Sequence, residues 1–161
     1  MPKIFRIDPD PESSFYRGQT INTPSMLCVE DYLVALNWAR ENGGLAGLIA
    51  RADANAQTLF DFCDAHPWIE NLAVDPATRS NTSVCLKFAD PRIVDGAAFA
   101  KAVAKRLEAE GVAFDIGAYR DAPAGLRIWC GATVEQSDIA AMLPWLAWAF
   151  EAEIAAQAKA A

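Results

Sequence analysis

Segments with helical periodicity alternate with pairs of short strand-like segments, and this order constrains the possible fold more than any other feature of the sequence. The predicted elements are, in chain order, helices over 23–44 and 45–65, strands over 68–74 and 81–89, a helix over 95–111, strands over 112–120 and 125–134, and a helix over 134–153. Strands that are joined by short turns pair antiparallel. The order therefore predicts an α+β fold in which helices pack on one face of a small, largely antiparallel sheet.

Capping residues mark where several of these helices should begin and end. Thr23, which is followed by proline, is a suitable N-cap for the first helix, and the NGG sequence at 42–44 is a glycine signal for its end. Thr133 and Gln136 have the spacing of a capping box before the last helix. Pro144 lies inside that helix and should kink it.

Length, charge and cysteine spacing limit the class of protein. The 161 residues suit one core, and a net charge of -7 argues against nucleic acid, whose protein partners need a basic face. We expect no stretch to span a bilayer, and the start has no secretory signal. Four separated cysteines without a CxxC pair favour reduced thiols in a cytoplasmic protein. We find no catalytic triad or metal-ligand spacing, and we expect His66 to cap a helix or lie on the surface.

The last predicted strand carries a permanent positive charge among apolar residues. Alternation places Leu126 and Ile128 on one face and Arg127 and Trp129 on the other. Arginine on a solvated face is common, but a tryptophan beside it makes full solvation less expected. An arginine also grips carboxylates and phosphates through its planar fork of donors. Because Arg120 lies seven residues earlier, near the same sheet edge, the two arginines predict an anion site.

A weaker signal for an anion site is the INTP sequence at residues 21–24. A plain helix start is sufficient to explain Thr23 and the proline that follows it. Asn22 adds an amide to this hydroxyl and to the free backbone N–H groups of a helix N-terminus, which together can bind an anion. Both interpretations stay open on the residues alone.

Two long segments resemble the C-terminal part of phosphoserine aminotransferase, in particular its proteobacterial branch. They read INTPSMLCVEDYLVALNWARENGG and YRDAPAGLRIWCGATVEQSDIAAMLPWLAWAF, and ARADANAQTLFDF and DPATRSNTSVCLKFADP fit the same family between them. The resemblance covers roughly residues 1–150. It implies the small domain of a fold-type I aminotransferase over 21–161, preceded at 1–20 by an irregular segment from the end of the large domain.

The resemblance also implies an activity and roles for four residues. Members of this family use pyridoxal phosphate to move an amino group between glutamate and 3-phosphohydroxypyruvate, giving phosphoserine and 2-oxoglutarate for serine biosynthesis. They are homodimers with active sites at the subunit interface. By resemblance, Arg127 holds the α-carboxylate of the substrate, and Asn22 and Thr23 bind the cofactor phosphate of the neighbouring subunit. Arg120 lies close to the basic residues that meet the substrate phosphate, which is a looser match.

The same resemblance implies that the lysine that forms the Schiff base is absent. The family's lysine lies upstream of the NTP segment, and no lysine of this sequence stands in a matching context; they are Lys3, Lys87, Lys101, Lys105 and Lys159. We therefore expect no covalently bound cofactor and no transaminase activity from the chain alone. Two alternatives are a stand-alone module that binds amino acids or phosphoamino acids without catalysis, and a structural partner for an N-terminal half.

Overall fold

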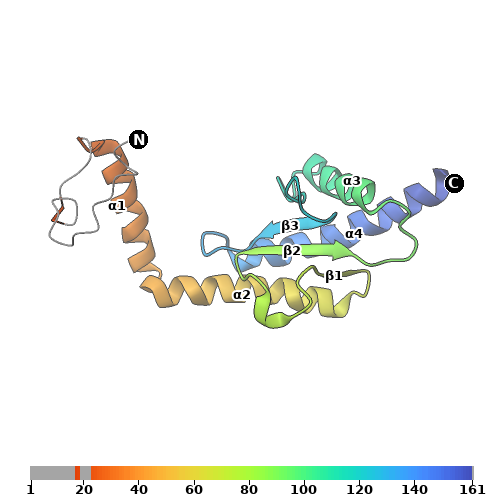
Figure 1. Cartoon of the computed structure of the whole chain (residues 1–161), viewed down its shortest axis with the longest axis horizontal. Coiled ribbons are helices and arrows are strands. Elements are labelled where there is room, and N and C mark those ends of the chain that lie inside the picture. Colours follow the sequence, from red (N-terminus) through yellow and green to blue (C-terminus); the bar gives the residue numbers. More distant parts are fainter. Residues whose placement is uncertain (1–16, 19–22, 161) are drawn as a thin grey trace. The chain divides into compact units, whose positions relative to one another are not determined.

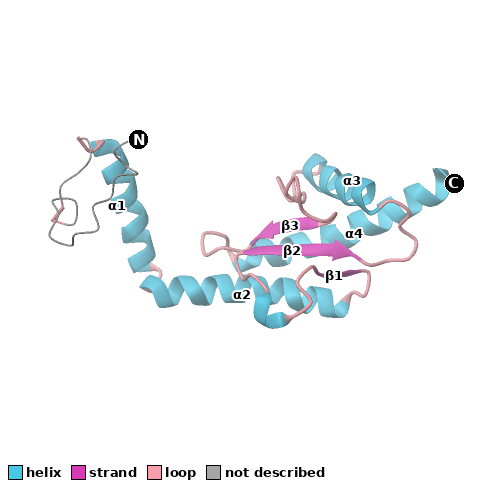
Figure 2. Ribbon diagram, in the orientation of Figure 1, coloured by secondary structure: helices cyan, strands magenta, loops and turns pink. Residues whose placement is uncertain are grey.

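A computed structural model describes residues 17–18 and 23–160 of the chain. Within them lie four α-helices, a short 3-10 helix and a three-stranded sheet (Figure 2), which confirms the α+β fold. The chain divides into two compact units, Met1–Leu45 and Ala46–Ala161, and each is described by itself. The predicted boundary near residue 20 is a statement about the intact enzyme and stays a prediction.

Helix α1 spans Met26–Glu41, and its N-cap is Ser25, not Thr23 as the sequence predicts. The Ser25 side chain accepts from the backbone N–H of Cys28 at 3.5 Å. Serine and threonine cap helices about equally well, so the sequence pattern did not distinguish the two positions. The end of the helix is confirmed: Asn42 is the C-cap, and Gly43 has a φ of 87°, which favours glycine.

Helix α2 spans Gly44–Ala65, which confirms the second predicted helix. Its buried residues recur with helical spacing and are Ala52, Asn55, Ala56, Leu59 and Cys63. At the C-terminal end, the Nδ1 atom of His66 lies 2.8 Å from the carbonyl oxygen of Phe62, which confirms the predicted capping role. The histidine ring also stacks on the Phe62 ring.

The sheet contains β1 (Ile69–Asn71), β2 (Ser83–Phe88) and β3 (Leu126–Trp129), antiparallel and in that order. In the register, Val84 of β2 faces Ile128 of β3, and Cys85 faces Arg127. The predicted strand over 112–120 is wrong. Only an isolated bridge joins Gly117 to Leu126, because Asp115 adopts a φ of 53° and interrupts the extended backbone.

The core lies between one face of the sheet and three helices, α2, α3 (Gly96–Ala109) and α4 (Gln136–Ala160), which Figure 1 shows around the strands. The sheet contributes Val84 and Leu86 from β2 and Leu126 and Ile128 from β3, all buried. Their strand neighbours on the opposite face are more exposed. The predicted arrangement, with helices on one face, is therefore confirmed.

Helix α4 departs from two expectations. It begins at Gln136, whose side-chain amide donates to the Thr58 hydroxyl at 3.0 Å, so the predicted capping box with Thr133 does not form. Pro144 lies inside the helix, as the sequence indicates, and the helix continues beyond it, while the kink stays a prediction. The segment Gln136–Lys159 is also long and apolar enough by composition to span a membrane, contrary to our expectation. One side of this helix supplies core residues such as Leu146, and a helix that is apolar on several faces can be a core helix as well as a membrane span.

Candidate functional site

The alternation of β3 places Arg127 on the sheet face opposite the core that α2, α3 and α4 cover. Leu126 and Ile128 point into the core, so Arg127 and Trp129 must point away from it. Trp129 is 57% exposed and the Arg127 side chain 34%, so among the described residues this face is neither buried nor fully solvated. A Cβ atom on Gly131 would overlap the Trp129 ring, which shows how closely the ring lies over this glycine.

Arg127 lines a hollow of about 330 Å³ on this open face. The other lining residues are Ser83, Phe114, Asp115, Ile116 and Trp129. The walls therefore combine apolar rings, one hydroxyl, one carboxylate and the guanidinium group. A hollow of this composition can take a small molecule that carries a carboxylate or phosphate group.

Two side chains meet the Arg127 guanidinium group. One terminal nitrogen lies 3.4 Å from a carboxylate oxygen of Asp115, and the side chain of Arg127 is 34% exposed. The Tyr119 ring centroid lies 5.8 Å from the guanidinium carbon, within the range of a cation–π contact. The backbone is also fixed here, because the Arg127 N–H donates to the Ile116 carbonyl at 2.8 Å. Two side chains thus contact the guanidinium group, while about a third of the Arg127 side chain stays open to solvent.

Arg120 does not line the same hollow as Arg127. It lines a second one of about 340 Å³, together with Lys101, Tyr119 and several alanines of α3 and the 117–125 loop. Tyr119 lines this hollow, and its ring also contacts the Arg127 guanidinium group. The sequence interpretation of Lys101 as a solvated helix residue is consistent with its exposure, but the lysine also adds a second cation beside Arg120.

The predicted cofactor-binding pair lies in the other unit. Asn22 falls outside the described residues, and Thr23 is exposed three residues before α1 begins. Since each unit is described by itself, the position of Thr23 relative to Arg127 stays a prediction.

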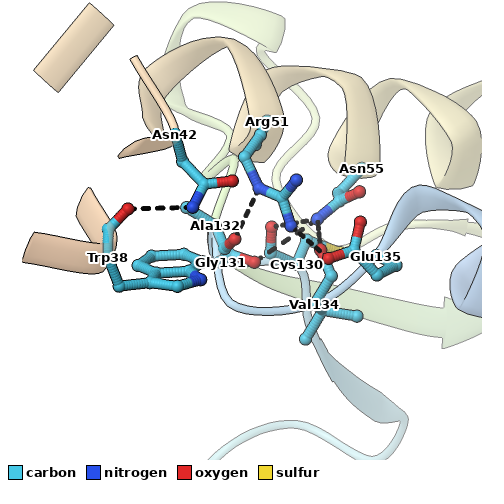
Figure 3. Close-up of polar contacts among 9 residues, drawn as sticks. All are labelled: Trp38, Asn42, Arg51, Asn55, Cys130, Gly131, Ala132, Val134 and Glu135. Atoms are coloured by element: carbon cyan, nitrogen blue, oxygen red, sulfur yellow. Dashed lines mark hydrogen bonds and ion pairs between the residues drawn. The ribbon is translucent and has the colours of Figure 1, made fainter. Parts of the chain in front are cut away.

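Sequence reasoning missed a polar clamp that holds the turn after β3 (Figure 3). The buried Asn55 amide of α2 donates to the carbonyls of Cys130, Gly131 and Val134 at 3.1, 3.3 and 2.9 Å. Arg51, one turn earlier, donates to the Ala132 carbonyl at 2.8 Å. The signal in the sequence was a single asparagine among the apolar residues that repeat with helical spacing along the buried face of α2.

Arg51 completes the clamp with an ion pair to Glu135, whose carboxylate lies 2.6 Å from a terminal nitrogen of the arginine. The clamp fixes residues 130–135 against α2, directly after the strand that carries Arg127. Its role is to position β3 and the start of α4.

Two buried cysteines of this unit, neither of which lines the hollow at Arg127, have thiols of raised pKa. Burial raises the pKa of the Cys130 thiol, which follows β3, to about 11. Burial and, to a smaller extent, Asp64 raise the pKa of the Cys63 thiol to about 11. Both thiols are therefore protonated and weakly nucleophilic at neutral pH. Over residues 17–18 and 23–160, no three His, Cys, Asp or Glu side chains are grouped to hold a metal ion.

The chain was compared with known proteins. No protein-family model matches it. In an alignment 154 residues long that covers 93% of this chain, it is 46% identical to phosphoserine aminotransferase from Methanosarcina barkeri (strain Fusaro / DSM 804). The chain is a homologue of part of phosphoserine aminotransferase. The Methanosarcina mazei protein of the same name is 44% identical over 94% of the chain.

This chain spans 40% of the length of both relatives. That share fits the predicted C-terminal portion. Among solved structures, phosphoserine aminotransferase from Bacillus circulans subsp. alkalophilus matches 82% of this chain with a TM-score of 0.70 and 22% identity. The pyridoxal-phosphate-bound enzyme from Trichomonas vaginalis matches 82% with a TM-score of 0.67 and 19% identity. At these identities the two structures support the fold, and the branch of the family stays a prediction.

Proposed function

We propose that this chain supplies the substrate-carboxylate site of a phosphoserine aminotransferase. The reaction would move an amino group between glutamate and 3-phosphohydroxypyruvate in serine biosynthesis. The relatives' shared name supports the substrate class. The observation that carries the proposal is Arg127, which stands on an open sheet face in a hollow large enough for a small amino acid.

Arg127 suits this role because every substrate and product of the reaction carries an α-carboxylate. A planar guanidinium group binds a carboxylate through two parallel hydrogen bonds and stays charged at any working pH. The antiparallel pairing with β2 and the Ile116 carbonyl fix its backbone. The Trp129 ring forms an apolar wall beside it, which limits the water that competes for the same donors. One fixed cation can thus orient two substrates in turn.

Arg120 is proposed to meet the substrate phosphate. Lys101 also lines its hollow, so two cations line the same space, and Tyr119 of that lining contacts Arg127. A phosphate group with about two negative charges favours such a pair. The sequence match at Arg120 is the looser one, so this assignment depends on the placement of the substrate.

Pyridoxal phosphate is the proposed cofactor of the intact enzyme. When bound, it supplies the electron sink that amino transfer requires. Asn22 and Thr23 would hold its phosphate, and the exposed Thr23 hydroxyl before α1 fits that group. We further propose that the intact enzyme is a cytoplasmic homodimer in which this pair reaches the neighbouring subunit.

The chain by itself is proposed to be inactive. No lysine of the sequence resembles the family's Schiff-base lysine in context. Lys87, for example, pairs with Glu70 on the neighbouring strand at 2.8 Å. The alternative of a stand-alone binding module is not favoured, because the similarity to the enzymes extends over 93% of the chain.

Calorimetric titration with phosphoserine tests this function. We expect binding to the wild-type chain, a loss of about tenfold or more in affinity in Arg127→Ala, and partial rescue in Arg127→Lys, which lacks the fork. Lys105→Ala removes one charge from an exposed position of α3 and is the matched control. Equal affinity in all four chains would exclude Arg127 as the carboxylate site. Phosphoserine transamination by the wild-type chain alone would exclude the proposed inactivity.

A further inference from the structure

Asp115 lies beside Arg127 for reasons that do not depend on their ion pair. The Arg127 N–H donates to the Ile116 carbonyl, and an isolated bridge joins Gly117 to Leu126, so the backbone of this loop is tied to β3. Asp115 itself has a φ of 53°, a conformation that aspartate tolerates better than most residues. The fold therefore holds a carboxylate next to the guanidinium group.

The contact between the two side chains is weak by geometry. A carboxylate oxygen of Asp115 meets one terminal nitrogen of Arg127 at 3.4 Å. A carboxylate that binds an arginine through both arms of the fork makes bonds of about 2.8 Å instead. The Asp115 side chain is also 92% exposed, so it returns to water at little cost when it is displaced.

The position of Asp115 makes it a competitor for ligands of Arg127. Both residues line the same hollow, so a ligand carboxylate that binds both arms of the Arg127 fork takes the place of Asp115 at the terminal nitrogen it contacts. The Tyr119 ring contacts the same guanidinium group, but it carries no charge that would compete. Displacement favours ligands that can bond to both arms of the fork.

We infer that Asp115 is a resident counter-ion of Arg127, which a ligand carboxylate displaces and which thereby lowers the affinity of the site for all carboxylates. This inference rests on the proposed function, since it assumes that Arg127 receives the substrate carboxylate. Asp115 does not touch the substrate in this account; it acts through Arg127. Its removal should therefore tighten binding, whereas removal of a merely structural residue would weaken it.

The test compares Asp115→Asn with Asp121→Asn in the full 161-residue chain. Asparagine keeps the shape of the side chain and tolerates the same backbone conformation. Asp121 is an exposed carboxylate farther along the same segment, so its variant makes the same change in net charge. Acetate and phosphoserine are the probes, and the NMR signals of the Arg127 Nε–H and Trp129 indole N–H groups report binding at the hollow.

Acetate should bind Asp115→Asn about two- to fivefold more tightly than it binds Asp121→Asn, the range expected when an exposed ion pair is removed. Equal affinity in the two variants, weaker binding in Asp115→Asn, or no acetate binding at Arg127 in any chain would overturn the inference. If Asp115→Asn binds acetate more tightly as expected while phosphoserine does not bind, the inference about the Asp115 counter-ion holds and the proposed function is wrong. If phosphoserine binds the wild-type chain and both variants with equal affinity, the proposed function holds and the inference about the Asp115 counter-ion is wrong.

Discussion

The Asn55 clamp gives the most direct prediction about stability. Asn55 is 1% exposed, and its side-chain nitrogen lies within hydrogen-bond distance of three carbonyl oxygens in the turn after β3. An amide group has two hydrogens, so two of these bonds can be fully formed at once. Asn55→Ala removes the donors and leaves the turn carbonyls without their partner.

The expected cost follows from those bonds. A lost hydrogen bond whose buried acceptor is left unsatisfied costs about 1–3 kcal/mol, and water that enters the space offsets part of it. Two bonds therefore predict a loss of about 2–4 kcal/mol in the free energy of unfolding. For a unit of this size the melting temperature should fall by roughly 10 °C.

Urea denaturation followed by tryptophan fluorescence measures this loss. Gln57→Ala is the matched control, because Gln57 is exposed on the same helix and its amide bonds to Asp61 across one turn, at 2.7 Å. The control should cost less than about 0.5 kcal/mol. If Asn55→Ala costs no more than Gln57→Ala, the clamp does not stabilise the turn and the reasoning is refuted.

Three further predictions concern a glycine and the cysteines. Gly125→Ala should lower the free energy of unfolding by about 2 kcal/mol or more, measured by urea denaturation, because a Cβ atom there would overlap the backbone carbonyl of Leu86. In the folded chain, iodoacetamide should label the exposed Cys28 well before the buried Cys63 and Cys130, as peptide mapping would show; equal rates would contradict their burial. Burial raises the pKa of the Cys130 thiol from 9.0 to about 11, so the thiol ionises in the unfolded chain before it ionises in the folded chain. The contribution of Cys130 to the free energy of unfolding should therefore be constant below pH 9 and decline between pH 9 and pH 11. Cys130→Val should reduce that decline in urea denaturation at pH 9–11, and an unchanged decline would contradict the assignment.

Much of the fold follows from local periodicity, and the errors have local causes. The helix α2 and the strand β3 were predicted because their apolar residues repeat with the period of the element. The strand predicted over 112–120 fails at Asp115, since one residue with a positive φ ends an extended run without changing the apolar pattern. Likewise Thr23 and Ser25 both suit an N-cap, so only the structure decides between them.

The candidate site shows where sequence reasoning stops. Arg127 could be placed on a strand face because side chains alternate along a strand. Its partners Asp115 and Tyr119 could not be predicted, because they approach through the path of a loop that the pattern describes as a strand. Arg120 was expected near Arg127, yet it lines a different hollow with Lys101, which only the packing of α3 against the loop reveals.

The central claim, that Arg127 receives an α-carboxylate, is tested most directly by comparing phosphoserine with phosphoethanolamine, which differs from it only in lacking that group. Calorimetry measures the affinity of the wild-type chain and of Arg127→Ala for each ligand, and the four values form a thermodynamic cycle in which the ligand carboxylate and the Arg127 side chain are each removed. Our account predicts that the wild-type chain prefers phosphoserine by about tenfold or more and that Arg127→Ala loses this preference. A preference that survives in Arg127→Ala would show that another group holds the carboxylate and would contradict the account.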